Sequence, residues 1–162
     1  MSWLLARVDD RLIHGQVVVA WGDRLRPRRI WVVDDGTAAD PWEREMLSAA
    51  APGVDVRVAT VSEAAEAYAT EAAAEGGAIL LVRNLATAHA LIEAGAAITT
   101  LNLGGLHYMP GKVKVNEYVY LDDTDRGHAR ALLARGVALE VQDIPAARPQ
   151  ALSALDSALR QS

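Results

Sequence analysis

The sequence predicts a single α/β domain: an open, mostly parallel, twisted sheet of about seven strands with helices on both faces. Short apolar segments alternate with longer helical patterns along the whole chain. The connections between them are short, which favours right-handed crossovers between parallel strands. A length of 162 residues with 51% hydrophobic residues suits one three-layer domain with a full core, spanning residues 1–162.

Seven short apolar segments followed by turn residues are predicted as strands. They are residues 3–8, 30–33, 54–59, 78–82, 98–103, 118–121 and 137–141. Residues 78–82 are apolar throughout, as expected of a strand that is covered on both faces. A helix precedes residues 137–141, so that strand can run in either direction, and we expect it to be an antiparallel edge strand.

Helical patterns fill most of the segments between the strands, but residues 106–114, between the fifth and sixth strands, are irregular. The helical patterns cover residues 15–24, 40–50, 60–75, 84–93, 122–134 and 149–159. The second begins with Asp-Pro-Trp-Glu at 40–43, which supplies an N-cap, a proline at the first helical position and a glutamate three residues after the cap. Thr60 and Glu63 form a second capping-box pattern.

Composition excludes several classes of function. The chain has no cysteine, so it can form neither disulfides nor thiolate metal sites. A net charge of −5 argues against a general nucleic-acid binder. No apolar run approaches the ~18 residues that span a bilayer, and no leader pattern is present, so we expect a cytoplasmic protein. The four histidines are scattered over different elements, and we expect neither a metal site nor a cofactor.

Residues 7–16, Arg-Val-Asp-Asp-Arg-Leu-Ile-His-Gly-Gln, lie between the first strand and the first helix. His14 stands at the start of that helix, where free N–H groups and a partial positive charge stabilise an anion. Arg7 and Arg11 can donate paired hydrogen bonds to phosphate oxygens, and Gly15 allows close approach to the backbone. The pattern predicts that His14 is a nucleophile carrying a phosphoryl group.

The roles of the neighbouring charged residues stay open on the residues alone. Asp9 or Asp10 could hold the second imidazole nitrogen and fix the tautomer, and we select Asp10 as the catalytic partner. Asp10 could instead cap the turn, Arg7 could pack inside the fold, and Arg11 could form a surface salt bridge. His14 itself could be an ordinary loop histidine with salt-bridged neighbours.

Ligands of parallel sheets bind beyond the carboxyl ends of the strands. This rule brings several polar segments to the edge that carries His14: residues 34–35, 60, 83–84 and 102–105. Gly104 and Gly105 are predicted to border the phosphate, although a glycine pair after a strand can simply make the turn. His107 and Tyr108 follow that turn and could contact a partner or a substrate.

The remaining candidates have simpler interpretations. His89 and His128 are expected on solvated helix faces, and Trp31 and Trp42 in packing contacts. The arginines at 26, 28 and 29 are expected in a solvated turn that could also dock an acidic partner.

The stretch at 7–16 resembles the signature of the mannose/fructose/sorbose-type enzyme IIB of the bacterial sugar phosphotransferase system. Further matching segments occur in the family's order over nearly the whole chain: residue 21 and residues 30–35, 38–40, 102–105 and 135–137. The resemblance implies the same open α/β fold. It also implies that His14 receives a phosphoryl group, usually on Nδ1, from a histidine of enzyme IIA and passes it to a sugar during import.

The resemblance implies partners as well. They are enzyme IIA, expected as a separate polypeptide, the membrane IIC/IID permease and a sugar, with the chain attached peripherally to the inner face of the membrane. One alternative is a regulatory or orphan module that is phosphorylated, or binds phosphate, without transport. Another is an α/β domain that binds a different phosphorylated metabolite. The identity of the sugar and the oligomeric state, a homo-oligomer included, stay open.

Overall fold

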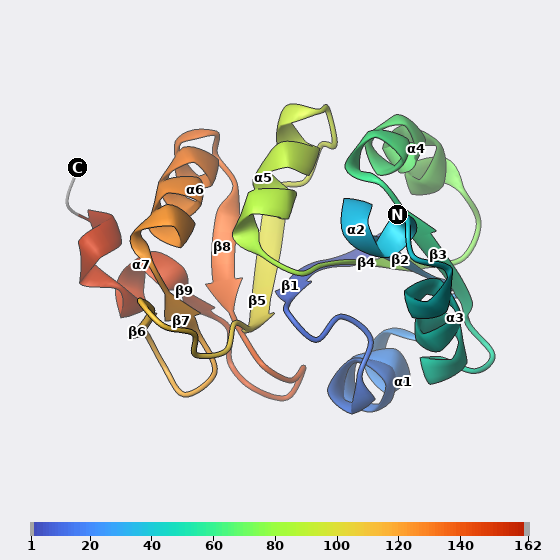
Figure 1. Cartoon of the computed structure of the whole chain (residues 1–162), viewed down its shortest axis with the longest axis horizontal. Helices are drawn as coiled ribbons and strands as arrows, with labels where there is room; N and C mark the ends of the chain where they lie inside the picture. Colours follow the sequence, from blue (N-terminus) through green and yellow to red (C-terminus); the bar gives the residue numbers. More distant parts are fainter. Residues whose placement is uncertain (1, 161–162) are drawn as a thin grey trace.

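The structure is a computed structural model that describes residues 2–160, and its centre is a seven-stranded sheet (Figure 1). The strand order is β3-β2-β4-β1-β5-β8-β9. The strands are β1 (Trp3–Asp9), β2 (Arg29–Val33), β3 (Asp55–Ala59), β4 (Ala78–Val82), β5 (Thr100–Gly105), β8 (Ala138–Val141) and β9 (Gln150–Ala151). Neighbouring strands are parallel except for β8 and β9. The predicted fold class is therefore confirmed.

Helices cover both faces of this sheet. They are η1 (Gln16–Trp21), α1 (Gly22–Leu25), α2 (Asp35–Ala38), α3 (Pro41–Ala50), α4 (Val61–Ala73), α5 (Leu85–Glu93), α6 (Asp123–Ala134), α7 (Leu152–Leu155) and η2 (Ser157–Arg160). In Figure 1, α4, α5 and α6 lie in the upper part of the view, and α1 and α3 lie in the lower part. No helix in the described part of the chain is long and apolar enough to cross a membrane.

The side chains of strand β4 pack into the apolar clusters on both faces of the sheet. All five of its side chains are buried, and successive residues point to opposite faces of the sheet. Leu80 joins the core cluster beneath α4, α5 and α6, whereas Ile79 and Leu81 join the cluster that contains Val17 of η1. Burying a leucine or isoleucine side chain of this kind stabilises the fold by about 1.5–3 kcal/mol.

The predicted helix starts are confirmed in detail. The Asp40 carboxylate accepts hydrogen bonds from the N–H groups of Trp42 and Glu43, at 3.0 and 3.4 Å. Thr60 and Glu63 form a reciprocal capping box. These caps satisfy N–H groups that have no partner within the helix, and they fix the residues at which α3 and α4 begin.

Two predicted strands are placed differently. Within residues 118–121 only β7 (Tyr120–Leu121) is a strand, and it pairs with β6 (Val113–Lys114) in a separate antiparallel ribbon. Residues 137–141, predicted as an antiparallel edge, form β8, which is parallel to β5 because α6 supplies a complete crossover. The antiparallel edge strand is β9, which follows β8 through a loop without a helix.

The predicted terminal helix at 149–159 is also wrong in part. Its first residues form β9, and the rest divides into α7 and η2 at Asp156, which has an extended backbone. The Asp156 carboxylate accepts a 2.8 Å hydrogen bond from Arg126 of α6, so this residue anchors the end of the described chain to α6.

Arg29 does not lie in a solvated turn as predicted. It is the first residue of β2, it is buried, and its guanidinium pairs with the buried Glu71 of α4. Nη2 of Arg29 donates to the carbonyl oxygens of Glu75 and Gly76, at 2.9 and 3.1 Å. Arg26 and Arg28 are exposed, as expected.

Candidate functional site

The loop between β1 and η1 holds His14 at the carboxyl edge of the sheet. The N–H of Leu12 donates to the carbonyl of Asp9 at 2.9 Å, and Leu12 has a left-handed backbone with φ of 56°. The side chains of Leu12 and Ile13 are buried in the cluster that contains Val17. Because apolar burial fixes both residues, the loop presents His14 in a defined position, with 15% of its side chain exposed.

Asp9 holds the imidazole of His14. Nε2 of His14 lies 2.9 Å from Oδ2 of Asp9, whose side chain is completely buried. Burial by itself raises the pKa of Asp9, but hydrogen bonds from His14 and from the Arg11 N–H, together with the charge of Arg7, outweigh it and lower the pKa. The ionised carboxylate can only accept, so Nε2 carries a proton, and in the neutral imidazole Nδ1 then keeps its lone pair.

Nδ1 of His14 has no hydrogen-bond partner within residues 2–160. A neutral imidazole with Nε2–H bound to a carboxylate and a free Nδ1 is arranged for nucleophilic attack through Nδ1.

Arg7 lies behind Asp9 and is completely buried. Its Nη2 approaches Oδ2 of Asp9 at 3.4 Å and donates to Oε1 of Gln16 at 3.2 Å and to the carbonyl of Asp143 at 2.9 Å. Arg7 and Asp9 lie on the same face of β1 because they are two residues apart. The guanidinium therefore supplies a fixed positive charge beneath the Asp9 carboxylate.

A second set of contacts fixes Arg7 from the neighbouring strand β5 and from the end of β8. Nη1 donates to the side-chain oxygen of Asn102 and, at 2.9 Å, to the carbonyl of Gln142. The Trp21 ring lies 5.2 Å from the guanidinium carbon, within range of a cation–π contact. Both Nη atoms are thus engaged inside the protein, which favours the packing role that the sequence left open over direct contact with phosphate.

Arg11 has the opposite character. Its N–H donates to Oδ1 of Asp9 at 3.1 Å, its Nε lies 3.5 Å from the same oxygen, and 44% of its side chain is exposed. His14 and Arg11 therefore meet the two oxygens of one carboxylate. An exposed guanidinium on this side of Asp9 is available to an anion that arrives at His14.

Asp10, selected from the sequence as the partner of His14, contacts His107 instead. Its two oxygens lie 2.6 Å from Nδ1 and 2.8 Å from the N–H of His107, and its own N–H donates to Gly105 at 2.9 Å. The Asp10 carbonyl accepts from Arg83 at 3.1 Å. Asp10 thus ties the loop to the segment after β5, and the carboxylate that orients His14 is Asp9.

The three glycines selected from the sequence differ in their surroundings. A Cβ added at Gly104 would overlap the Arg7 guanidinium, so this glycine makes room for Arg7. A Cβ at Gly105 would lie 3.3 Å from Oδ1 of Asp9 and 3.5 Å from Nη2 of Arg11, at the border of the site. Gly15 has nothing within 4 Å of an added Cβ and leaves open space beside His14.

Some of the other polar residues predicted at this edge form contacts with one another rather than with His14. Asp34 caps α2 and bonds Thr37, whose hydroxyl accepts from Arg83 at 3.3 Å. Tyr108 is exposed and packs edge-to-face against Tyr120. Within residues 2–160, no group of three or more histidine, cysteine or acidic side chains is arranged to hold a metal ion.

Two of the predictions for residues outside the site are wrong. His89 and His128 are half-buried rather than solvated, and their Nδ1 atoms lie 2.9 Å apart. Trp42, expected in packing, is 68% exposed, whereas Trp31 is buried as predicted.

Comparison with known proteins gives one consistent result. The family model described as "PTS system sorbose subfamily IIB component" matches residues 3–161. The mannose-specific EIIAB component of Escherichia coli K12 is 39% identical over 141 residues, which cover 86% of this chain but only 44% of that relative. The N-acetylgalactosamine-specific enzyme IIB component 1 of the same organism is 33% identical over 88% of this chain and 90% of its own.

Solved structures agree with the sequence comparisons. The crystal structure of the IIBSor domain of the Klebsiella pneumoniae sorbose permease superposes with a TM-score of 0.87 and 31% identity, covering 100% of this chain and 99% of that one. The structure of manxB from Thermoanaerobacter tengcongensis superposes with a TM-score of 0.84 and 31% identity, covering 94% of both chains.

Proposed function

The chain belongs to the sorbose subfamily of IIB components of the sugar phosphotransferase system, and from this membership we propose that His14 is its phosphoryl carrier. In this proposal His14 accepts a phosphoryl group from a histidine of enzyme IIA and passes it to a sugar during import. The observation that carries the proposal is the pairing of Nε2 with the buried Asp9, which leaves Nδ1 unpaired in the described structure.

The first transfer needs positioning and charge stabilisation rather than a strong base. The lone pair of Nδ1 forms the new N–P bond while the N–P bond to the donor histidine breaks. The proton on Nε2 stays on the hydrogen bond to Asp9, and the carboxylate stabilises the positive charge that develops on the imidazole. The hydrogen bonds from His14 and from the backbone N–H of Arg11, with a smaller effect of the Arg7 charge, lower the pKa of Asp9 and keep it ionised.

The second transfer reverses this change on His14. A sugar hydroxyl forms the new O–P bond, the bond from phosphorus to Nδ1 breaks, and the imidazole regains its lone pair. The hydroxyl proton leaves to water or to a base of the partner. Because Asp9 holds the ring through both steps, the same nitrogen accepts and releases the group.

Arg11 is proposed as the phosphate-binding side chain of the loop. It is the exposed guanidinium that shares the Asp9 carboxylate with His14, so it can pair with phosphate oxygens without breaking the core. Gly15 and Gly105 are proposed to border the phosphate, because neither places a side chain against it. We propose that Arg7, Gly104 and Asp10 do not contact the phosphate and instead support Asp9 and the loop.

The proposed partners follow from the chemistry of a carrier. A phosphoryl donor of the enzyme IIA type and a membrane permease of the IIC/IID type must both reach the edge that carries His14. We therefore propose that the protein works in the cytoplasm, at the inner face of the membrane, through contact with that permease.

The test is phosphoryl transfer in a mixture of the general phosphotransferase proteins, an enzyme IIA of this family and labelled phosphoenolpyruvate. We expect an acid-labile, base-stable label on the wild-type chain and none on His14→Ala. Phosphorus NMR of the labelled protein should assign the group to Nδ1. Label that persists on His14→Ala, or that lies on Nε2, would contradict the proposal.

A further inference from the structure

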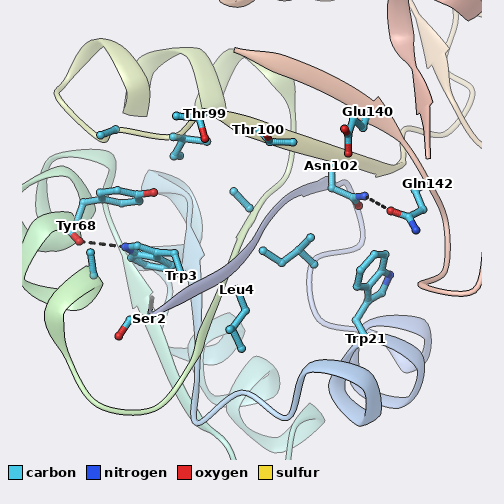
Figure 2. Close-up of a pocket in the computed structure, with 15 residues that line it drawn as sticks. Ser2, Trp3, Leu4, Trp21, Tyr68, Thr99, Thr100, Asn102, Glu140 and Gln142 are labelled. Carbon is cyan, nitrogen blue, oxygen red and sulfur yellow. Dashed lines mark hydrogen bonds between the residues drawn. The ribbon is translucent and has the colours of Figure 1, made fainter. Parts of the chain in front are cut away.

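A groove of about 520 Å³ opens between β1 and β5 (Figure 2). Pairing between these strands begins at Arg7 and Asn102, so residues 3–6 of β1 and the segment that precedes β5 do not pair with each other. The two strands diverge toward their amino ends, and the groove occupies the space between them. Its volume lies in the range of about 300–1,000 Å³ that is typical of small-molecule sites.

Aromatic side chains form two walls of the groove. Trp3 stacks on Tyr68 with ring centroids 4.9 Å apart and planes 10° apart, and its indole N–H donates to the Tyr68 carbonyl at 3.0 Å. Trp21 stands at the opposite end in Figure 2, and its indole N–H donates to Asp143 at 2.9 Å. Both indoles are fixed with their N–H groups in use. Trp3 is half-buried and offers ring surface to an occupant, whereas the buried Trp21 closes the other end of the groove with its ring against Arg7.

The two amides in the lining are also in use. Asn102 donates to the side-chain oxygen of Gln142 at 3.1 Å, and Gln142 donates to the carbonyl of Ala147 at 2.8 Å. Asn102 also accepts from Arg7. These amides belong to the support of Arg7 and are not free to recognise a ligand.

Glu140 is different from the rest of the lining. It is the only charged side chain among the residues that form the groove, and it is half-buried. Within residues 2–160 its carboxylate has no hydrogen bond or ion pair. A partly desolvated carboxylate that lines an apolar groove and has no cation beside it is complementary to a positively charged group.

We propose that this groove binds a small organic cation with an aromatic or apolar body. The ammonium group pairs with Glu140, and the body packs along the groove toward Trp3 and Tyr68. This site is separate from His14 and does not depend on the function proposed above.

The test compares three probes that share an indole ring: tryptamine, its neutral alcohol tryptophol, and the anion indole-3-acetate. Isothermal titration of the whole chain should show tryptamine binding about 10-fold more tightly than tryptophol, with indole-3-acetate weakest. Glu140→Gln should reduce the affinity for tryptamine to that for tryptophol and leave tryptophol unchanged. Glu45→Gln, which removes an exposed carboxylate on α3, is the matched control and should change nothing.

A second variant tests the location. Ala97 lines the groove and is exposed, so Ala97→Phe should fill the space and weaken binding of all three probes. Both variants should keep the circular dichroism spectrum and the phosphoryl transfer of the wild type. Equal affinities for the three probes, no binding of tryptamine at millimolar concentration, or binding that survives either substitution would overturn the proposal.

Discussion

Nε2 of His14 lies 2.9 Å from Oδ2 of Asp9, and this contact determines which imidazole nitrogen is free to react. The same carboxylate receives Arg7 from beneath and Arg11 from the exposed side. Asp9 is therefore the centre of a charged cluster in which one arginine is buried and the other is open to solvent. The two arginines have different consequences for stability and for transfer, and these can be separated by mutation.

Asp9→Asn should slow phosphorylation of His14 by at least ~100-fold, because an amide can donate to Nε2 and stabilise the tautomer with the proton on Nδ1. The measurement is the initial rate of label incorporation from enzyme IIA at a temperature where circular dichroism shows both proteins folded. Asp10→Asn is the matched control, since Asp10 contacts His107 rather than His14, and it should stay within a few-fold of wild type. Equal rates for Asp9→Asn and wild type would refute the role of Asp9.

Arg11→Ala should slow transfer by roughly 10-fold while changing the free energy of unfolding by less than about 0.5 kcal/mol, because it removes an exposed charge rather than core volume. Transfer rates and urea denaturation of the same preparations measure the two effects. Arg24→Ala, an exposed arginine in α1, is the control and should affect neither. If transfer by Arg11→Ala proceeds at the wild-type rate, Arg11 does not contact the phosphate.

Arg7→Lys should destabilise the protein by about 3–5 kcal/mol, because a lysine ammonium cannot replace the contacts of a buried guanidinium with Asp9, Asn102 and two carbonyl oxygens. That loss is a large part of the ~5–15 kcal/mol by which domains are stable. Urea denaturation should show it, with Arg11→Lys as the conservative control. A variant that keeps wild-type stability but transfers slowly would instead assign Arg7 to the phosphate.

The sequence pattern places His14 in the loop after the first strand, as in the structure, but it selects Asp10 rather than Asp9 as the partner of the imidazole. Asp9 and Asp10 are adjacent, and the apolar run of the predicted strand ends at residue 8. In the structure β1 continues through Asp9, so the period of two puts Arg7 and Asp9 on one face and leaves Asp10 beyond the strand. Extending that alternation by one residue would have identified the pair that holds His14.

The residues of β5 and of the segment after β8 that fix Arg7 could not be found in the same way. Gln142 and Asp143 are separated from Arg7 by 135 and 136 residues, and their contacts use backbone carbonyl oxygens, which leave no mark in the sequence. Asn102 gave a weak signal, as a polar residue between two leucines in a strand. Patterns within short segments of the sequence predict strands and helix caps. The contacts of Arg7 with β5 and the end of β8 depend instead on the order of the strands in the sheet, which such patterns do not give.

Gly104→Ala should destabilise the protein strongly, because the added methyl group would overlap the buried Arg7 guanidinium and displace it from Asp9. Overpacking of this kind typically costs about 1–3 kcal/mol. Gly15→Ala is the matched control: its backbone has φ of −51° and its added Cβ meets nothing within 4 Å, so thermal unfolding should be unchanged or slightly raised. If Gly15→Ala keeps full stability but transfers the phosphoryl group more slowly, Gly15 lies beside the phosphate. If its transfer rate equals that of wild type, Gly15 does not border the phosphate.

The lowered pKa of Asp9 predicts a specific dependence of stability on pH. Because the pKa is below the ordinary value of 3.8 in the folded state, the stabilising effect of the ionised Asp9 is complete above the pKa of the unfolded chain. It is lost as the pH falls through the folded-state pKa. Over that interval wild type should lose up to ~1.4 kcal/mol per pH unit more than Asp9→Asn, which has no proton to bind there.

Urea denaturation of wild type and Asp9→Asn between pH 6 and pH 3 measures this difference. Glu63 and Asp122 also have lowered pKa values, from hydrogen bonds in their capping boxes, and they weaken both proteins in acid. Their effects cancel in the comparison, so a difference that shrinks toward pH 3 isolates Asp9. If the difference in the free energy of unfolding stays constant with pH, Asp9 is not held ionised by His14, Arg7 and Arg11. The proton would then not be fixed on Nε2, and Nδ1 would not be kept free.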